Sequence, residues 1–241
     1  MTEPVFTGSL VKLERASRFI DELEQLLRTF NESQPFSARF DFSATPPKIV
    51  LDWKSLPREV GAVLGDAVHN LRAALDLLAS ELARTNGKSD RNVYFPFAAS
   101  ATEFPSALSK RNFDKAGSDA VALLHSFAPY RGGNKLLRAV HDLDIEDKHT
   151  ALLETEKTMN IQLHGSYDIT NPSINQLSLE GSSIQHYFAN ESPLKGKLVV
   201  DTLREIHREV LRVVEAFRTL VSARETGVPN DPMVSRPQGD A

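Results

Sequence analysis

Apolar residues recur every three to four positions over four long stretches of the chain, which is the period of an amphipathic helix. Two shorter stretches show the same period less regularly. The pattern predicts long helices over residues 9–30, between residues 55 and 86, and over residues 134–147 and 197–223, with short helices over 101–110 and 114–126.

Alternating apolar and polar residues predict strands in two places. Residues 36–42 alternate in this way, and a turn at 45–47 leads to a second run, so a hairpin is predicted within residues 36–54. Residues 151–188 are rich in Thr, Ile, Gln, Ser and Tyr, which predicts three or four short strands. The expected fold class is therefore α+β and helix-dominated: a bundle of long helices with a small antiparallel β-sheet from the hairpin and the strands within 151–188.

One globular domain is predicted over residues 1–225. Residues 226–241 contain three prolines, two glycines and little apolar content, so they are predicted to form a disordered tail. No stretch approaches the roughly 20 apolar residues of a membrane span, and the first residues carry neither a basic start nor an apolar run. We therefore expect a cytoplasmic protein with no membrane partner.

Composition and charge narrow the classes of function. The net charge of −4 argues against a protein that coats nucleic acid or membranes in general, although it leaves room for a local basic site. Because there is no cysteine, disulfides and thiolate metal sites are ruled out. The sequence contains no glycine-rich phosphate loop, nucleophile elbow or H-E-x-x-H motif, and no cofactor and no metal are predicted.

The central helix has two unlike faces. One is an ordinary apolar stripe, while the other carries His69, Arg72 and Asp76 among small residues, with no lysine or glutamine from 59 to 82. Its glycines, Gly61 and Gly65, cost about 1 kcal/mol each in a helix interior, which is understandable if another element approaches closely. This face is predicted to be packed, with His69 and Arg72 mostly buried; the alternative is a solvated face that happens to lack lysine.

A second polar cluster ends the helix over residues 134–147. Residues 136–149 hold four acids, two histidines and two bases. Acids at a helix C-terminus oppose the helix dipole, so a basic partner such as Arg72 is expected; the alternative is a polar helix end that faces water. The two clusters together define the candidate site: His69, Asn70, Arg72, Asp76, Asp144, Asp147, Lys148 and His149.

Residues 65–76 read G-D-A-V-H-N-L-R-A-A-L-D, and Leu143 is followed by Asp147-Lys-His149. With Tyr94-Phe-Pro96 and Pro129-Tyr130, these blocks resemble a family of uncharacterised bacterial and phage-associated proteins with G-D-x-x-H-N-x-R-x-x-L-D and L-H-x-L-x-x-x-D-K-H motifs. The resemblance covers roughly residues 60–153 and implies that the two blocks belong together, without implying a mechanism. Leu77 replaces a histidine that is common in the family, and Asp144-Ile145 replaces a pair of asparagines.

Three functions are compatible with these residues. The first is a polar interhelical site that binds an unknown ligand or protein partner, or holds two helices in register. The second is a metal-independent ribonuclease like the helical HEPN family of defence and toxin proteins, with His69 or His149 moving a proton and Arg72 stabilising the phosphorane; RNA would be the partner only in this case. The Arg-x4–6-His spacing of that family is absent. The third is a di-metal site, because Asp66-x-x-His69 and Glu146-x-x-His149 have suitable spacing, but bridging glutamates are not identifiable. Whether the protein is an enzyme stays open.

Overall fold

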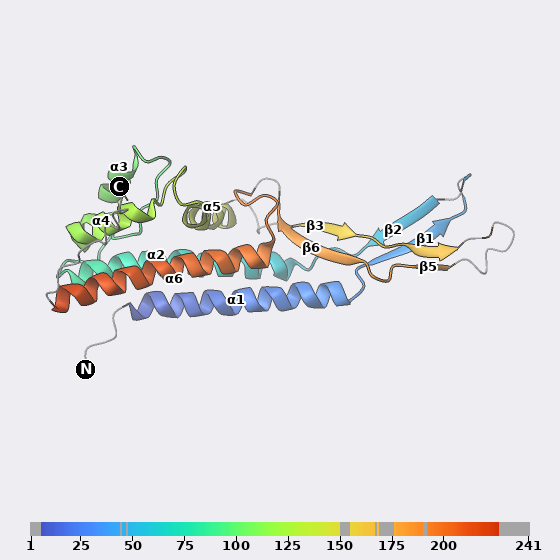
Figure 1. Ribbon diagram of the computed structural model, residues 1–241, viewed down its shortest axis with the longest axis horizontal. Helices are drawn as coiled ribbons and strands as arrows, with labels where there is room; N and C mark the ends of the chain where they lie inside the picture. The colour runs from blue at the N-terminus through green and yellow to red at the C-terminus, as the bar shows by residue number, and fades with distance from the viewer. Residues whose placement is uncertain are drawn as a thin grey trace, which may run out of the picture. The chain divides into compact units, whose positions relative to one another are not determined.

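The computed structural model describes residues 6–226 except 44, 47, 150–154, 167, 169–175 and 190–191, and it leaves out the side chains of Lys148, His149, Ser166 and Gln176. The helix-dominated α+β class is confirmed (Figure 1). The helices are α1 (Thr7–Glu32), α2 (Arg58–Thr85), α3 (Phe104–Lys110), the 3-10 helix η1 (Phe113–Ala116), α4 (Ser118–Phe127), α5 (Lys135–His149) and α6 (Val199–Thr226).

α2 is followed by a glycine with a left-handed backbone conformation. Gly87 takes a positive φ of 69°, which glycine tolerates without steric cost. This conformation lets Lys88 N donate to Ala83 O at 2.9 Å and Gly87 N donate to Arg84 O at 2.9 Å. The two bonds form a Schellman motif, which satisfies carbonyl groups that the end of a helix would otherwise leave free.

The described strands pair two by two and are all antiparallel. The predicted hairpin is β1 (Phe36–Asp41) with β2 (Lys48–Trp53), and its register places Phe36 opposite Trp53. Residues 155–188 contribute β3 (Thr155–Asn160) with β6 (Ser183–Phe188), and β4 (His164–Ser166) with β5 (Gln176–Ser178). The small sheet expected from the sequence is thus three two-stranded sheets within the described residues.

The chain contains two compact units. The first comprises Met1–Val11, Ala73–Arg138 and Glu209–Ala241. Its core includes an aromatic cluster in which the ring of Phe217 from α6 lies 6.2 Å from Phe113 and 6.1 Å from Phe127. The short elements η1 and α4 therefore pack against one stretch of α6. Edge-to-face and tilted ring pairs of this kind stabilise a core beyond the apolar area that they bury.

The second unit comprises Lys12–Arg72 and Ala139–Arg208 and holds all six described strands. Fully buried leucines from four helices form its helical core: Leu23, Leu64, Leu143 and Leu203. The prediction of one domain over residues 1–225 stays a prediction. Thr226, the first residue of the predicted tail, still belongs to α6, and residues 227–241 lie outside the described part of the chain, so the disordered tail stays a prediction. Within the described residues, none of the helices is apolar enough over a sufficient length to cross a membrane.

Candidate functional site

The two polar blocks of the sequence meet between α2 and α5, inside the second unit. Nδ1 of His69 lies 3.1 Å from Oδ1 of Asp144. Because an ionised carboxylate only accepts hydrogen bonds, the histidine nitrogen is the donor. Asp144 is 5% exposed and His69 has a side chain that is 48% exposed. A buried acid thus holds one nitrogen of a half-exposed imidazole.

Gly65 lies one helical turn before His69 and is buried against Asp147 of α5. A Cβ atom at residue 65 would lie 2.7 Å from Cγ of Asp147, which is closer than such atoms approach in proteins. The glycine therefore makes room for a carboxylate at the helix contact. This is the close approach that the small residues of the second α2 face predict.

The prediction that His69 and Arg72 are both mostly buried is half wrong. Arg72 is 7% exposed, as expected. His69 is half exposed because Asp144, rather than the imidazole, is the buried side chain of the pair. The imidazole contacts this acid through Nδ1 only.

Asn70 is buried but faces a different neighbour. Its Nδ2 donates to Asp66 O at 2.8 Å, and its Oδ1 accepts from Nζ of Lys12 on α1 at 3.3 Å. The described hydrogen bonds of Asn70 therefore join α2 to α1 rather than to α5. Lys12 was not among the predicted residues, because a single lysine in an amphipathic helix carries no signal of its partner.

Of the other predicted residues, Asp76 has a described partner away from the cluster. Asp76 belongs to the first unit, where its Oδ1 accepts from Phe95 N at 2.9 Å and holds the segment that follows α2. The side chains of Lys148 and His149 lie outside the described residues, so their predicted part in the site stays a prediction. The described core of the candidate site is His69 and Asp144, with Gly65 and Asp147 beside them.

Replacing Gly65 by leucine is expected to lower the free energy of unfolding by roughly 1–3 kcal/mol, because the larger side chain overpacks the contact with Asp147. Thermal melting with a matched Ala62→Leu variant tests this, since Ala62 is exposed on the same helix and its variant should stay within about 0.5 kcal/mol of the wild type. A Gly65→Leu protein that melts like the wild type contradicts the close contact.

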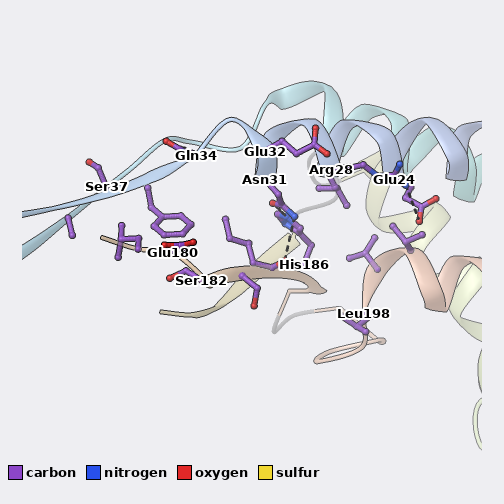
Figure 2. A pocket seen from close by; sticks show the side chains of 18 of the residues that line it. Glu24, Arg28, Asn31, Glu32, Gln34, Ser37, Glu180, Ser182, His186 and Leu198 are labelled. Carbon is purple, nitrogen blue, oxygen red and sulfur yellow. Dashed lines mark hydrogen bonds and ion pairs between the residues drawn. The ribbon is translucent and has the colours of Figure 1, made fainter. Parts of the chain in front are cut away.

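A second candidate region is a cleft of about 980 Å³ in the second unit, which sequence reasoning did not find (Figure 2). It is lined by the last turns of α1, by β1, by residues 177–184 and by the start of α6. Its walls carry the acids Glu24, Glu32, Glu180 and Asp201, and the base Arg28. These segments are far apart in the sequence, so no local pattern reveals the cleft.

His186 of β6 lies in the wall of this cleft and is 7% exposed. Its Nε2 donates to Oδ1 of Asn31 at 3.0 Å, and Nδ2 of Asn31 lies 3.5 Å from Ile184 O; Figure 2 shows the two labelled side chains meeting. Burial lowers the pKa of His186 below its usual 6.5, and the positive charge of Lys157 lowers this pKa further. Lys157 lies opposite His186 in the β3–β6 ladder. His186 is therefore a neutral hydrogen-bonding group that holds α1 to β6.

The lowered pKa of His186 predicts a loss of stability in acid. As the pH falls below about 6.5, the unfolded chain takes up a proton on this histidine while the folded protein does not, so the free energy of unfolding decreases. Above this pH, histidine is neutral in both states and contributes no pH dependence. Urea unfolding at pH 7.5 and at pH 5.5, for the wild type and for His186→Gln, measures the effect. The difference in stability between the two pH values should be smaller in His186→Gln, and an equal difference contradicts it.

Among the side chains that the structure describes, no group of three or more His, Asp or Glu residues is arranged to hold a metal ion. Comparisons with protein-family models, with curated proteins and with solved structures give no match to this chain. The resemblance carried by the two sequence blocks stays a prediction, and the function has to be inferred from the geometry of α2 and α5.

Proposed function

We propose that the α2–α5 cluster is a polar binding and structural site, in which Asp144 and Asp147 hold α5 against α2 and His69 contacts a small polar ligand. The observation that carries the proposal is the hydrogen bond between a buried carboxylate and a half-exposed imidazole, at 3.1 Å. If His69 served only in packing, its side chain would be buried. If it were an ordinary solvated side chain, it would not be hydrogen-bonded to a buried acid.

The chemistry of the pair supports ligand contact. Asp144 fixes the proton of the neutral ring on Nδ1, which leaves a lone pair on Nε2. None of the described side chains hydrogen-bonds to Nε2 of His69. This nitrogen can accept a hydrogen bond from a ligand hydroxyl or amine, and after protonation it can donate to an anion. The orientation is fixed in advance, which reduces the entropy lost on binding.

A ribonuclease of the HEPN kind is the second candidate, because a histidine oriented by a carboxylate is also suited to general acid–base catalysis. Two observations disfavour it. The reaction needs a cation that reaches the phosphate, whereas Arg72 is 7% exposed. In addition, none of the seven histidines has the Arg-x4–6-His spacing of that family.

Two measurements on purified protein test the choice. Mass spectrometry of the small molecules released on denaturation should find one that wild-type protein carries and His69→Ala does not. Incubation with single-stranded RNA should give no cleavage. His69→Gln is the matched control for His69→Ala, because its amide keeps a hydrogen-bonding group near the position of the ring nitrogens.

The outcomes separate the two candidates. RNA cleavage by the wild type that is lost in a well-folded His69→Ala variant supports the ribonuclease and contradicts the binding site. If wild-type and His69→Ala proteins release the same molecules, His69 is not the ligand contact and the proposal fails.

A further inference from the structure

Two segments of the first unit, residues 84–94 and 110–115, form a basic surface. Hydrogen bonds hold them side by side: Tyr94 N donates to Arg111 O at 3.1 Å, and Nδ2 of Asn112 donates to Asn92 O at 2.9 Å. Nζ of Lys115 donates to Arg91 O at 3.1 Å. Three hydrogen bonds to main-chain oxygens therefore keep the two segments next to each other.

The surface has the opposite charge to the whole chain. Its two segments hold six bases and two acids, although the net charge of the protein is −4. Arg84 pairs with Asp90 at 3.6 Å, and the five bases that remain form what we call the Tyr94 patch, together with Tyr94: Lys88, Arg91, Lys110, Arg111 and Lys115. The first four of these bases are exposed and Lys115 is half-buried.

Tyr94 gives this patch an aromatic surface. It is 44% exposed, and Cζ of Arg111 lies 5.8 Å from the centre of its ring. An exposed aromatic ring among basic side chains is the arrangement that binds unpaired nucleotides: the basic side chains attract phosphates, and the ring stacks on a nucleobase. Arginine beside such a ring adds a second planar group for stacking.

We propose that the Tyr94 patch binds single-stranded nucleic acid, with the five basic side chains on the phosphates and Tyr94 stacked on a base. The positive charge of the patch complements any polyanion. Tyr94 favours a single strand, because the nucleobases of a duplex are already stacked on one another. This site is separate from the proposed His69 site and does not depend on it.

The test is fluorescence anisotropy of labelled 12-residue oligouridine, oligothymidine and a matched DNA duplex at 50 and 200 mM salt. The wild type should bind the single strands more tightly than the duplex, and more weakly at 200 mM salt because counterions are released on binding. The RNA and DNA arms identify which single strand the patch prefers.

Five variants locate the binding. The double variant Lys88→Glu/Lys110→Glu should weaken single-strand binding about ten-fold or more. The control is Lys195→Glu/Lys197→Glu, which makes the same charge change on exposed residues of the second unit. It should change the binding less than about two-fold. Tyr94→Ala should weaken single-strand binding about five-fold or more, and Tyr94→Phe, which keeps the ring, should not. His69→Ala should bind like the wild type.

Three results would overturn the proposal: no binding by the wild type at 50 mM salt, equal losses in the two double variants, or a duplex bound as tightly as the single strands. Because all the substituted side chains are exposed, circular dichroism should show every variant folded. If the Lys88→Glu/Lys110→Glu variant does not fold, the comparison of binding by Tyr94→Ala with binding by Tyr94→Phe tests the proposal.

Discussion

Replacing Glu81 by alanine is expected to lower the free energy of unfolding by about 3 kcal/mol or more. Glu81 of α2 is 9% exposed, and its carboxylate lies at the start of α1 in the first unit. It accepts hydrogen bonds from Gly8 N at 2.8 Å, from Ser9 N at 3.4 Å and from Oγ of Ser9 at 2.6 Å. These backbone groups are among the first N–H groups of a helix, which have no partner within it.

The loss should be large for two reasons. The alanine variant leaves buried donors without their acceptor, and each such group costs about 1–3 kcal/mol. It also removes a negative charge from the positive end of the α1 dipole, which contributes up to about 2 kcal/mol in a partly buried position.

Urea unfolding followed by circular dichroism measures the effect, with two controls. Glu81→Gln keeps one acceptor and loses the charge, so its loss should be intermediate. Ser9→Ala removes only the hydroxyl bond and should lose about 1 kcal/mol. An alanine variant within about 0.5 kcal/mol of the wild type would show that Glu81 does not hold the first turn of α1.

Asp144→Ala is expected to lower the free energy of unfolding by about 2–4 kcal/mol. The side chain is 5% exposed and accepts the hydrogen bond of Nδ1 of His69. Truncation removes a buried charge-assisted hydrogen bond and opens space at the α2–α5 contact. Asp144→Asn is the matched control, because the amide has nearly the same shape and keeps one oxygen acceptor, so its loss should be smaller.

A double-mutant cycle of Asp144→Ala and His69→Ala isolates the energy of the pair from the other effects of each substitution. We expect a coupling of about 1–2 kcal/mol, near the lower end of the roughly 1.5–3 kcal/mol of a hydrogen bond to a charged group, because the imidazole is half exposed. Additive losses would mean that the two side chains are neighbours without an energetic connection, and would weaken the case for a site there.

The helices and the hairpin were predictable because local pattern alone determines them. The apolar stripe of α2 keeps the helical period from Val60 to Leu82, and Gly87 marks its end. Gly65 also carried usable information: a glycine on a face without lysine predicts a close contact, and the carboxylate of Asp147 lies there. Glu81 carries only a weak signal, an acid three residues after Leu78 of the apolar stripe.

The exposure and the hydrogen-bond partners of the site residues depend on which distant segments of the chain come into contact. The local sequence pattern does not determine these contacts. The sequence placed His69 on a packed face, but its exposure is set by where Asp144 lies. Asp76 stands on the same helix as His69, yet its carboxylate binds Phe95 N of the following segment. His186 and Asn31 are 155 residues apart and no motif connects them.

The pairing of the strands two by two has a consequence for how the second unit opens in solution. A strand with a single hydrogen-bonded neighbour has half of its amides outside the ladder, and a two-stranded hairpin is at best marginally stable in water by itself. Few hydrogen bonds within a sheet therefore have to break for a pair to separate. Native-state hydrogen exchange should record three openings of low free energy for β1–β2, β3–β6 and β4–β5, while the buried turns of α2 exchange only when the unit unfolds.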